Sequence, residues 1–404
     1  MKKLRVGVLF GGRSGEHEVS LLSAASVLKA IDKRKFDVVP IGITKQGNWV
    51  TGSDAERLLS SGTLTAAPEQ LTAQPEAATA KALPAEDPTP APTAMLARGE
   101  AVIVPPVPSP NSLVPFETAA QPLPREALRL DVIFPVLHGT FGEDGTIQGL
   151  FELAGIAYVG SGVLGSSTGM DKDVMKKLFA FSGLPMVKHV SLLRAEWQAS
   201  PRKTVARIEA ALKYPLFVKP ANLGSSVGIS KAHNRKELGP ALDLAARFDR
   251  KIVVEQGVGG ARRRAREIEV AVLGNDKPQA SVVGEIVPGK EFYDYEAKYL
   301  SEGSVPIIPA KLTRQQTRQI QQMAVAAFQA CDCAGLARVD FLMDPGAGQR
   351  IYVNELNTLP GFTPISMYPK LWAASGIDYK TLITRLIELA MERHREREQN
   401  SYSV

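Results

Sequence analysis

The chain has 404 residues, a length that predicts roughly two to three domains, each with a buried core of its own. Hydrophobic residues make up 44% and charged residues 22%, a balance that excludes a fibrous or disordered chain. No apolar run reaches the roughly 18 to 20 residues of a membrane-spanning helix, and the basic N-terminus leads into a strand without a small-residue cleavage site. We therefore expect a cytoplasmic protein with no membrane insertion.

The net charge of +6 comes largely from one short segment that contains Arg262, Arg263, Arg264 and Arg266. No basic stripe interleaved with aromatic residues occurs elsewhere, so we expect no nucleic-acid partner. An arginine cluster of this kind is more often a solvated loop than a docking site. The two cysteines, at 331 and 333, have a C-x-C spacing that suits neither a zinc site nor a disulfide framework, which predicts free buried thiols.

The first elements predict a Rossmann-like βαβ unit with a parallel sheet. A strand at 6–10 is followed by a turn, a helix at about 20–31 and a second strand at 37–43. The turn, GGRSGEHEVS, looks like a nucleotide-binding loop but has no lysine for a phosphate.

This turn carries charged residues whose purpose must be explained. Gly11 and Gly12 allow a sharp turn, and Ser20 is expected to cap the helix. We expect the loop to present Glu18 at the carboxyl end of the parallel sheet, where ligands commonly bind. Its neighbours at 16 and 17 are interpreted as structural or solvent-facing.

The region 61–124 differs from the rest of the chain. It holds 13 of the 28 prolines and has almost no periodic apolar pattern, so we expect most of it to be an irregular or disordered surface insertion. A buried-strand pattern resumes at 128–139 and is followed by an apolar helix led by carboxylates. We place the N-terminal domain at 1–142, with the insertion inside it.

Two further units follow. A helix at 171–181, strands at 216–220 and 251–257 and a helix at about 234–248 predict a central α+β unit, 143–255. A C-terminal unit is placed at 256–404. Its predicted strands are 268–274, 280–289, 336–344 and 350–357, its long helix is 313–331, and further helices begin near 366.

Two late strands carry the most informative polar residues. Asp340 lies in ARVDFLMD, and alternation places Glu355 and Asn357 on one face of RIYVNELN. If the strands pair, three oxygen ligands converge, a sparse set that suits Mg²⁺ completed by water and nucleotide phosphates. The alternative is an edge strand whose polar face meets water. Arg338 on the same face and the apolar flanking positions favour a site.

A glycine-serine loop, FVKPANLGSSVGIS, follows a strand that ends at Lys219. Backbone N–H groups around Ser225 can lie over phosphates. The chain contains no GxxxxGK[ST] sequence, so this is not a Walker P-loop. Taken alone, a hairpin turn explains the loop equally well.

Other residues extend a possible nucleotide site. The strand edge 255–258 offers main-chain groups to an adenine, and Glu267 offers a carboxylate to ribose hydroxyls. Lys172 is a further candidate for phosphate binding, although lysines on exposed helix faces are usually only solvated. Lys298 and Tyr299 lie in EFYDYEAKYL, whose aromatic and charged residues predict a mobile cover that excludes water.

Together these motifs, with LHGTFGEDGTIQG, GSGVLGSSTGMDK and VNELNTLPGFTPIS, resemble the D-alanine:D-alanine ligase family of the ATP-grasp superfamily. The resemblance runs from residue 4 to about 390, outside the proline-rich insertion. It implies an α/β chain with a Rossmann-like N-terminal domain followed by a two-subdomain ATP-grasp fold. It also implies an ATP-dependent ligase that phosphorylates one D-alanine and joins it to a second for peptidoglycan synthesis. Family members are homodimers, with the N-terminal domain as the expected contact.

The resemblance implies a role for each candidate residue. Two Mg²⁺ or Mn²⁺ ions would be held by Asp340, Glu355 and Asn357. The ATP phosphates would be bound by Lys172, Lys219 and Lys298, and the adenine and ribose by Glu255, Gln256, Val258 and Glu267. The oxyanion would be stabilised by Arg338 and the N–H of Gly361. The second D-alanine would contact Ser366 and Met367, with His138 near the reacting groups. The first D-alanine would lie within a hydrogen-bonded trio of Glu18, Ser225 and Tyr299.

Several alternatives stay open. In this family a tyrosine at position 299 accompanies dipeptide formation, which favours D-alanyl-D-alanine over the products of a D-alanine:D-lactate or D-alanine:D-serine ligase. A catalytically silent paralogue would be expected to lack at least one of Arg338 and the three metal ligands. Gln256 replaces a lysine of some family members, GGARRRAR lengthens the turn before Glu267, and the 61–124 insertion exceeds the expected family length.

Overall fold

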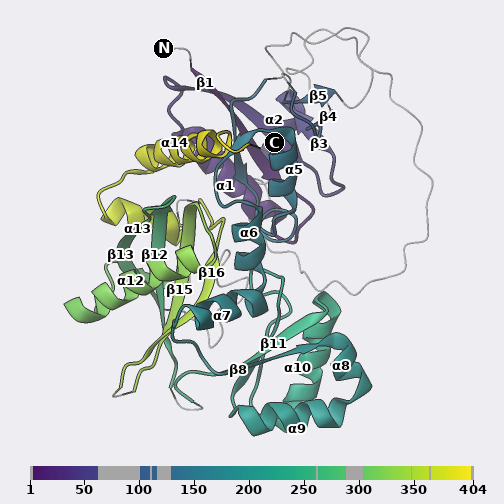
Figure 1. Cartoon of the computed structure of the whole chain (residues 1–404), viewed down its shortest axis with the longest axis vertical. Helices are drawn as coiled ribbons and strands as arrows, with labels where there is room; N and C mark the ends of the chain where they lie inside the picture. The colour runs from purple at the N-terminus through teal and green to yellow at the C-terminus, as the bar shows by residue number, and fades with distance from the viewer. Residues whose placement is uncertain are drawn as a thin grey trace.

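The computed structural model describes residues 3–61, 101–109, 112–115, 129–260, 263–287, 304–346, 348–363 and 365–401. Three larger sheets organise this part of the chain, each with helices packed against it (Figure 1). The first is mainly parallel and the other two are antiparallel, which confirms the prediction of an α/β fold with an N-terminal Rossmann-like unit.

The first sheet has the order β3-β2-β1-β6-β7. Its strands are β1 (Leu4–Gly11), β2 (Phe36–Ile43), β3 (Trp49–Thr51), β6 (Val132–Val136) and β7 (Ala157–Tyr158). All neighbours are parallel except β3, which is antiparallel to β2 at one edge. Its helices are α1 (His17–Ala30), α2 (Gly52–Ser61) and α5 (Thr146–Ala154). The strands are almost continuously apolar because residues on both sheet faces enter hydrophobic cores.

Two predictions about this first unit differ from the structure. The unit continues beyond residue 142, because β7 pairs with β6 and completes the sheet. Helix α1 begins at His17, three residues before the predicted start, so Ser20 lies within the helix. The Ser20 hydroxyl accepts a hydrogen bond from Gly11 N–H at 2.8 Å and donates one to the Val136 carbonyl. Ser20 therefore joins the ends of two strands instead of capping the helix.

Part of the predicted insertion is packed against the N-terminal unit. Strands β4 (Val102–Ile103) and β5 (Val114–Pro115) pair with each other, and Val102 and Leu113 are buried in one of its cores. The surface-insertion prediction does not apply to this hairpin. The stretches 62–100 and 116–128 lie outside the described residues.

The central sheet has the order β10-β9-β11-β8 and is antiparallel. Its strands are β8 (His189–Leu193), β9 (Leu216–Pro220), β10 (Ser230–Ala232) and β11 (Lys251–Gln256). Its helices are α8 (Arg194–Ala199), α9 (Pro201–Ala211) and α10 (Arg235–Phe248). The Asn234 side chain caps α10 by accepting two backbone N–H groups, and this unit has a hydrophobic core of its own.

The third sheet has the order β14-β13-β12-β15-β16 and is also antiparallel. Its strands are β12 (Arg266–Gly274), β13 (Gln279–Val287), β14 (Val305–Ile307), β15 (Gly335–Met343) and β16 (Ile351–Asn357). Helices on or beside it are α6 (Val163–Met170), α7 (Lys172–Phe181), α12 (Arg314–Ala330) and α13 (Met367–Ala374). A capping box between Thr313 and Gln316 starts α12, close to the predicted start.

The last helix returns to the beginning of the chain. Helix α14 (Tyr379–Arg397), drawn in yellow, lies beside the purple α1 in Figure 1. One hydrophobic core contains residues of β1, β6, β12 and α14, which fixes the first and third sheets relative to each other. Both cysteines are buried and free, as predicted.

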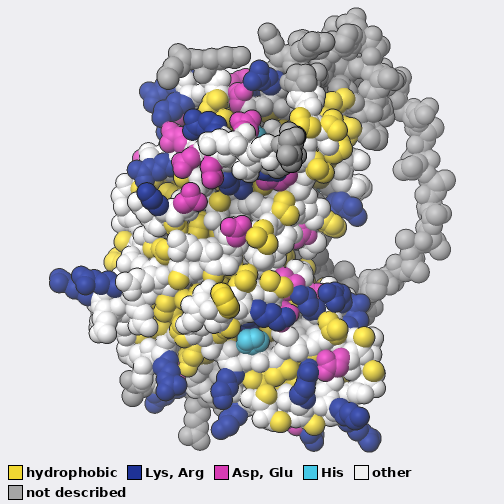
Figure 2. All heavy atoms as spheres, viewed as in Figure 1, with side chains coloured by type: hydrophobic (Ala, Val, Ile, Leu, Met, Phe, Trp, Pro, Cys, Tyr) yellow, Lys and Arg dark blue, Asp and Glu magenta, His cyan; other side chains and the backbone are white. Residues whose placement is uncertain are grey.

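The mixed charge of the surface and the lengths of the helices agree with the composition of the chain. On the face drawn in Figure 2, Lys and Arg side chains are spread from top to bottom with acidic side chains among them. No helix among the described residues is both long and apolar enough to cross a membrane.

Candidate active site

Two cavities, of about 420 and 350 Å³, adjoin each other between the sheets. The first is lined by residues of all three units, and the second lies between β9 and β11 of the central sheet and the strands of the third sheet. Among the described residues, five line both cavities: Ser226, Ile229, Glu269, Arg338 and Glu355. A molecule in one cavity therefore lies next to a molecule in the other.

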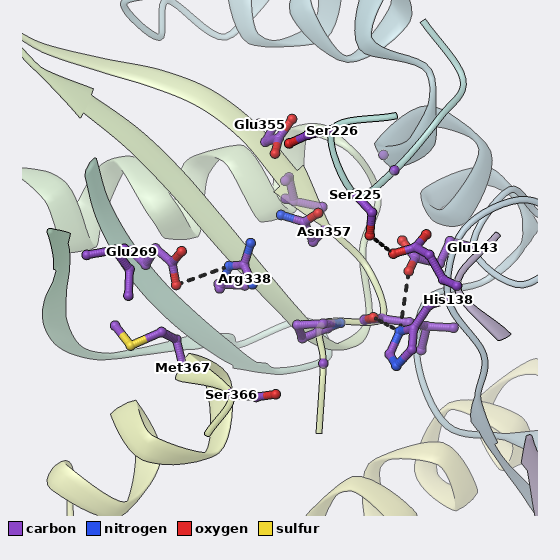
Figure 3. Close-up of a pocket in the computed structure, with 18 of the residues that line it drawn as sticks. His138, Glu143, Ser225, Ser226, Glu269, Arg338, Glu355, Asn357, Ser366 and Met367 are labelled. Carbon is purple, nitrogen blue, oxygen red and sulfur yellow. Dashed lines mark hydrogen bonds and ion pairs between the residues drawn. The ribbon is translucent and has the colours of Figure 1, made fainter. Parts of the chain in front are cut away.

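The first cavity collects most of the residues that the sequence predicts for amino-acid binding and chemistry. Those that line it are His138, Lys172, Ser225, Arg338, Glu355, Asn357, Gly361, Ser366 and Met367. Figure 3 shows Ser366 and Met367 on one side of this space, and Ser225, His138 and Glu143 on the other. The cavity is mixed in polarity, with charged groups from the N-terminal unit facing the third sheet.

The carboxylate that meets Ser225 is Glu16, and the predicted contact with Glu18 is wrong. Ser225 Oγ donates a hydrogen bond to Glu16, which is buried and lines the first cavity. Glu18 forms an ion pair with Lys45, is 47% exposed and lines neither cavity. Because helix α1 starts at His17, residues 16 and 18 point in nearly opposite directions around its axis. The earlier start of the helix thus explains the wrong choice between two nearby carboxylates.

Two glycines make room for Glu16. A Cβ at Gly224 would lie 2.8 Å from a Glu16 carboxylate oxygen, and a Cβ at Gly139 would also collide with it. Gly139 has a φ of +73°, which independently favours glycine. The carboxylate is therefore held tightly between the turn after β6 and the glycine-serine loop.

His138 lies beside Glu16 and connects the N-terminal unit to the third. Its Nδ1 lies 3.1 Å from the Leu359 carbonyl and 3.7 Å from a Glu143 oxygen, and its Nε2 lies 3.2 Å from Ser23 Oγ. Burial acts to lower the pKa of His138, but Glu143 and Glu16 outweigh it and raise that pKa above its usual value. Glu143 was missed from the sequence; its place five residues after His138 in HGTFGED was the available signal.

Arg338 occupies the junction of the cavities between two carboxylates. Strands β15 and β16 pair, which is the condition for the three oxygen ligands to converge, with Asp340 opposite Glu355 and Arg338 opposite Asn357. The Arg338 guanidinium donates from Nε and a terminal nitrogen to both oxygens of Asp340, each at 2.7 Å. Its Nε also lies 3.3 Å from Glu269, a buried residue of β12 (Figure 3). The sequence reasoning missed Glu269, whose alternation with Glu267 in REIEV places it on the same strand face.

The predicted metal ligands come together at this junction. Asn357 donates to Asp340 at 3.1 Å, and Glu355 is the strand partner of Asp340. Within the described ranges, no cluster of three or more His, Cys, Asp or Glu side chains is arranged to hold a metal ion. Two carboxylates and one amide are nevertheless a donor set that fits Mg²⁺ or Mn²⁺, because such ions take further ligands from phosphates and water.

The second cavity has apolar walls and a charged floor. Pro215, Phe217, Val258, Phe341 and Leu342 line it and form surfaces suited to a flat aromatic ring. Gln256 and Glu267 also line it, but the Gln256 side-chain oxygen accepts the Lys213 N–H at 3.0 Å.

On the floor of this cavity, Glu255 and Lys219 face each other. The Glu255 carboxylate lies between the ammonium groups of Lys219 and Lys176, at 2.6 Å from each. Its side chain is therefore held by lysines, and any adenine contact at residue 255 must come from the backbone.

The arginine segment is exposed at two of its described positions, as predicted, and it also borders this cavity. Arg263 and Arg264 are exposed but line the cavity, and Arg264 lies 3.6 Å from Glu267. Arg266 forms a two-nitrogen ion pair with Glu285. Residues 261 and 262 lie outside the described residues, as do Lys298 and Tyr299, so the predicted cover and the third member of the trio have no position here.

The chain matches two family models along most of its length. D-ala D-ala ligase N-terminus matches residues 5–161 and D-ala D-ala ligase C-terminus matches residues 178–388. The D-alanine–D-alanine ligase of Natranaerobius thermophilus is 47% identical over 99% of this chain and 98% of its own. That of Bacillus cytotoxicus is 46% identical over 404 residues, which is 100% of both chains. Both relatives therefore align with this chain almost from end to end.

Solved structures with the same architecture include two ligases. The VanG D-Ala:D-Ser ligase from Enterococcus faecalis is 33% identical with a TM-score of 0.77, covering 96% of this chain and 100% of that chain. The D-alanine-D-alanine ligase from Coxiella burnetii is 32% identical with a TM-score of 0.75, covering 99% of this chain and 97% of that chain. With both halves matched by family models and relatives aligned from end to end, the chain belongs to the D-alanine–D-alanine ligase family.

Proposed function

We propose that this protein joins two D-alanines to D-alanyl-D-alanine with the conversion of ATP to ADP and phosphate, for peptidoglycan precursor synthesis. The observation that carries the proposal is the position of Arg338 and the Asp340–Glu355–Asn357 set where the two cavities adjoin. The second cavity suits the nucleotide and the first suits the amino acids. A phosphoryl group can then pass from one ligand to the other at their junction.

The first step transfers the phosphoryl group. A carboxylate oxygen of the first D-alanine attacks the γ-phosphorus, the bond to the β-phosphate oxygen breaks, and ADP leaves. Glu16, held by Ser225, binds the ammonium of this D-alanine and orients its carboxylate. Lys172 and Lys219 bind phosphate oxygens from two sides. Two Mg²⁺ or Mn²⁺ ions held by Asp340, Glu355 and Asn357 would neutralise charge on the phosphates.

The second step forms the peptide bond. The amine of the second D-alanine attacks the acyl carbon, and the carbonyl oxygen becomes an oxyanion until phosphate leaves. Arg338 and the Gly361 N–H supply positive charge and a fixed donor for this oxyanion. Ser366 and Met367 lie where the second D-alanine would bind, and the Ser366 hydroxyl already contacts Thr363 Oγ1 at 2.8 Å. We further propose that the enzyme works in the cytoplasm as a homodimer.

The purified protein should release phosphate from ATP only when D-alanine and Mg²⁺ are both present, and mass spectrometry should identify D-alanyl-D-alanine. D-cycloserine, a D-alanine mimic, should inhibit the reaction. Phosphate release with L-alanine but not D-alanine would contradict the assignment. A larger yield of D-alanyl-D-serine from equal amounts of D-alanine and D-serine would favour the activity that the VanG relative is named for.

A further inference from the structure

A buried cluster of three charged residues forms the floor of the second cavity. Glu255 Oε2 lies 2.6 Å from Lys219 Nζ, and Glu255 Oε1 lies 2.6 Å from Lys176 Nζ. The side chains of Lys176, Glu255 and Lys219 are 1%, 4% and 10% exposed. Lys219 and Glu255 line the cavity, and Lys176 lies behind them, so two cations accompany one carboxylate.

Helix α7 positions Lys176 beneath the second cavity. Lys172 and Lys176 are four residues apart and therefore lie on one face of the helix, an arrangement that is unfavourable between like charges without other partners. Here each has its own acceptor: Lys172 donates to the Leu223 carbonyl at 2.8 Å, and Lys176 also lies 3.4 Å from the Asn354 carbonyl. The helix thus directs one lysine into the first cavity and the other beneath the second.

The charge of this cluster has a functional consequence. Glu255 and Lys219 alone would form a neutral pair, and a neutral pair attracts phosphate only weakly. Burial opposes both charges, yet the lysines hold the pKa of Glu255 well below its usual value and the surrounding carboxylates, Glu255 first, raise that of Lys219. Because burying a third charge costs free energy that an apolar side chain would avoid, Lys176 is better explained by binding than by stability.

We propose that Lys176 is a positioning residue for the nucleotide: it takes up one oxygen of Glu255 and so leaves Lys219 with positive charge directed at the phosphate chain. This inference rests on the proposed function, because it takes an adenosine phosphate as the ligand of the second cavity. Lys176 itself does not line that cavity, so its effect must pass through Glu255 and Lys219.

The test compares nucleotides with different numbers of phosphates, by titration calorimetry of the full chain at constant Mg²⁺. Lys176→Met should weaken ATP and ADP binding by roughly tenfold and adenosine binding by less than about twofold, as expected when one nearby charge is lost. Lys176→Arg should bind all three as the wild type does. Lys176→Met combined with Glu255→Gln should recover ADP binding, because Lys219 alone again gives the cluster one net positive charge.

Several outcomes would overturn the inference. Equal weakening of ADP binding and adenosine binding in Lys176→Met would mean that Lys176 only maintains structure. Additive losses of ADP affinity in the double variant would mean the same. Unchanged ADP binding in folded Lys176→Met would also contradict it. If Lys176→Met does not fold, Lys176→Gln, which keeps a donor to Glu255 without the charge, must give the same result. Wild-type protein that binds no nucleotide would instead reject the proposed function.

Discussion

The two charged clusters of the site have opposite compositions. Beneath the second cavity, Glu255 lies between Lys176 and Lys219, so cations exceed carboxylates by one. At the junction of the cavities, Arg338 lies between Asp340 and Glu269, so carboxylates exceed cations by one. The first cluster suits phosphates and the second suits metal ions. Burying either excess charge costs stability, so we attribute both to ligand binding.

Removing Arg338 should have the largest effect. Arg338→Met removes the cation that we propose stabilises the oxyanion, so kcat should fall roughly 10²- to 10³-fold while the protein stays folded. It also leaves Asp340 and Glu269 without their shared cation, so Mn²⁺ binding measured by electron paramagnetic resonance should become tighter. Activity close to the wild-type level would refute the oxyanion role. Weaker Mn²⁺ binding would contradict the inference that the excess of carboxylates around Arg338 suits metal ions.

Glu269 tests whether the second cluster needs both carboxylates. Glu269→Gln should lower kcat/KM roughly tenfold or more. Residues that do not touch the substrate but orient a residue that does commonly contribute that much. Glu285 on β13 is a matched control: it is also 7% exposed but pairs with Arg266 and lines neither cavity. Glu285→Gln should destabilise the protein on thermal unfolding with kcat/KM unchanged. Equal losses of kcat/KM in the two variants would mean that Glu269 matters no more for catalysis than Glu285 does.

Glu16 and Glu18 test the amino-acid end of the first cavity. Glu16→Gln should raise the KM for D-alanine roughly tenfold to a hundredfold, the usual cost of losing a charged hydrogen-bond partner. Glu18→Gln loses only an exposed ion pair with Lys45 and should leave this KM unchanged. Steady-state kinetics distinguishes the two, and a larger effect at Glu18 would restore the sequence-based assignment.

The smallest expected effect is a dependence of stability on acid. Because the pKa of Glu255 is lowered in the folded protein, its stabilising effect is present above the usual pKa of about 4.5 and is lost as the pH falls below it. The free energy of unfolding should fall by up to about 1.4 kcal/mol per pH unit more steeply in the wild type than in Lys176→Met/Glu255→Gln. Parallel acid unfolding curves would mean that Glu255 is not charged in the folded state.

Local patterns predicted the elements well where signals lay next to one another in sequence. Helices α7, α10 and α12 begin beside the side chains that cap them, Asp171, Asn234 and Thr313. Pairing of β15 with β16, and hence the meeting of Asp340 with Glu355, follows from two neighbouring strands with polar residues at matching places. Helix α1 was misplaced because no side chain caps its start, and the turn chemistry therefore gave no signal at His17.

By itself, the sequence determined the family and the order of the elements, and most of the site residues that it predicted line the two cavities. It could do so because motifs and periodic apolar patterns are local properties of the chain. Tertiary structure alone decided that Glu16 meets Ser225, that Lys176 pairs with Glu255 and that Glu269 pairs with Arg338. Lys176 and Glu255 are 79 positions apart, and only the packing of α7 against β11 brings their charges together. The net charge of a buried cluster depends on such contacts between residues far apart in the sequence, so no local pattern predicts it.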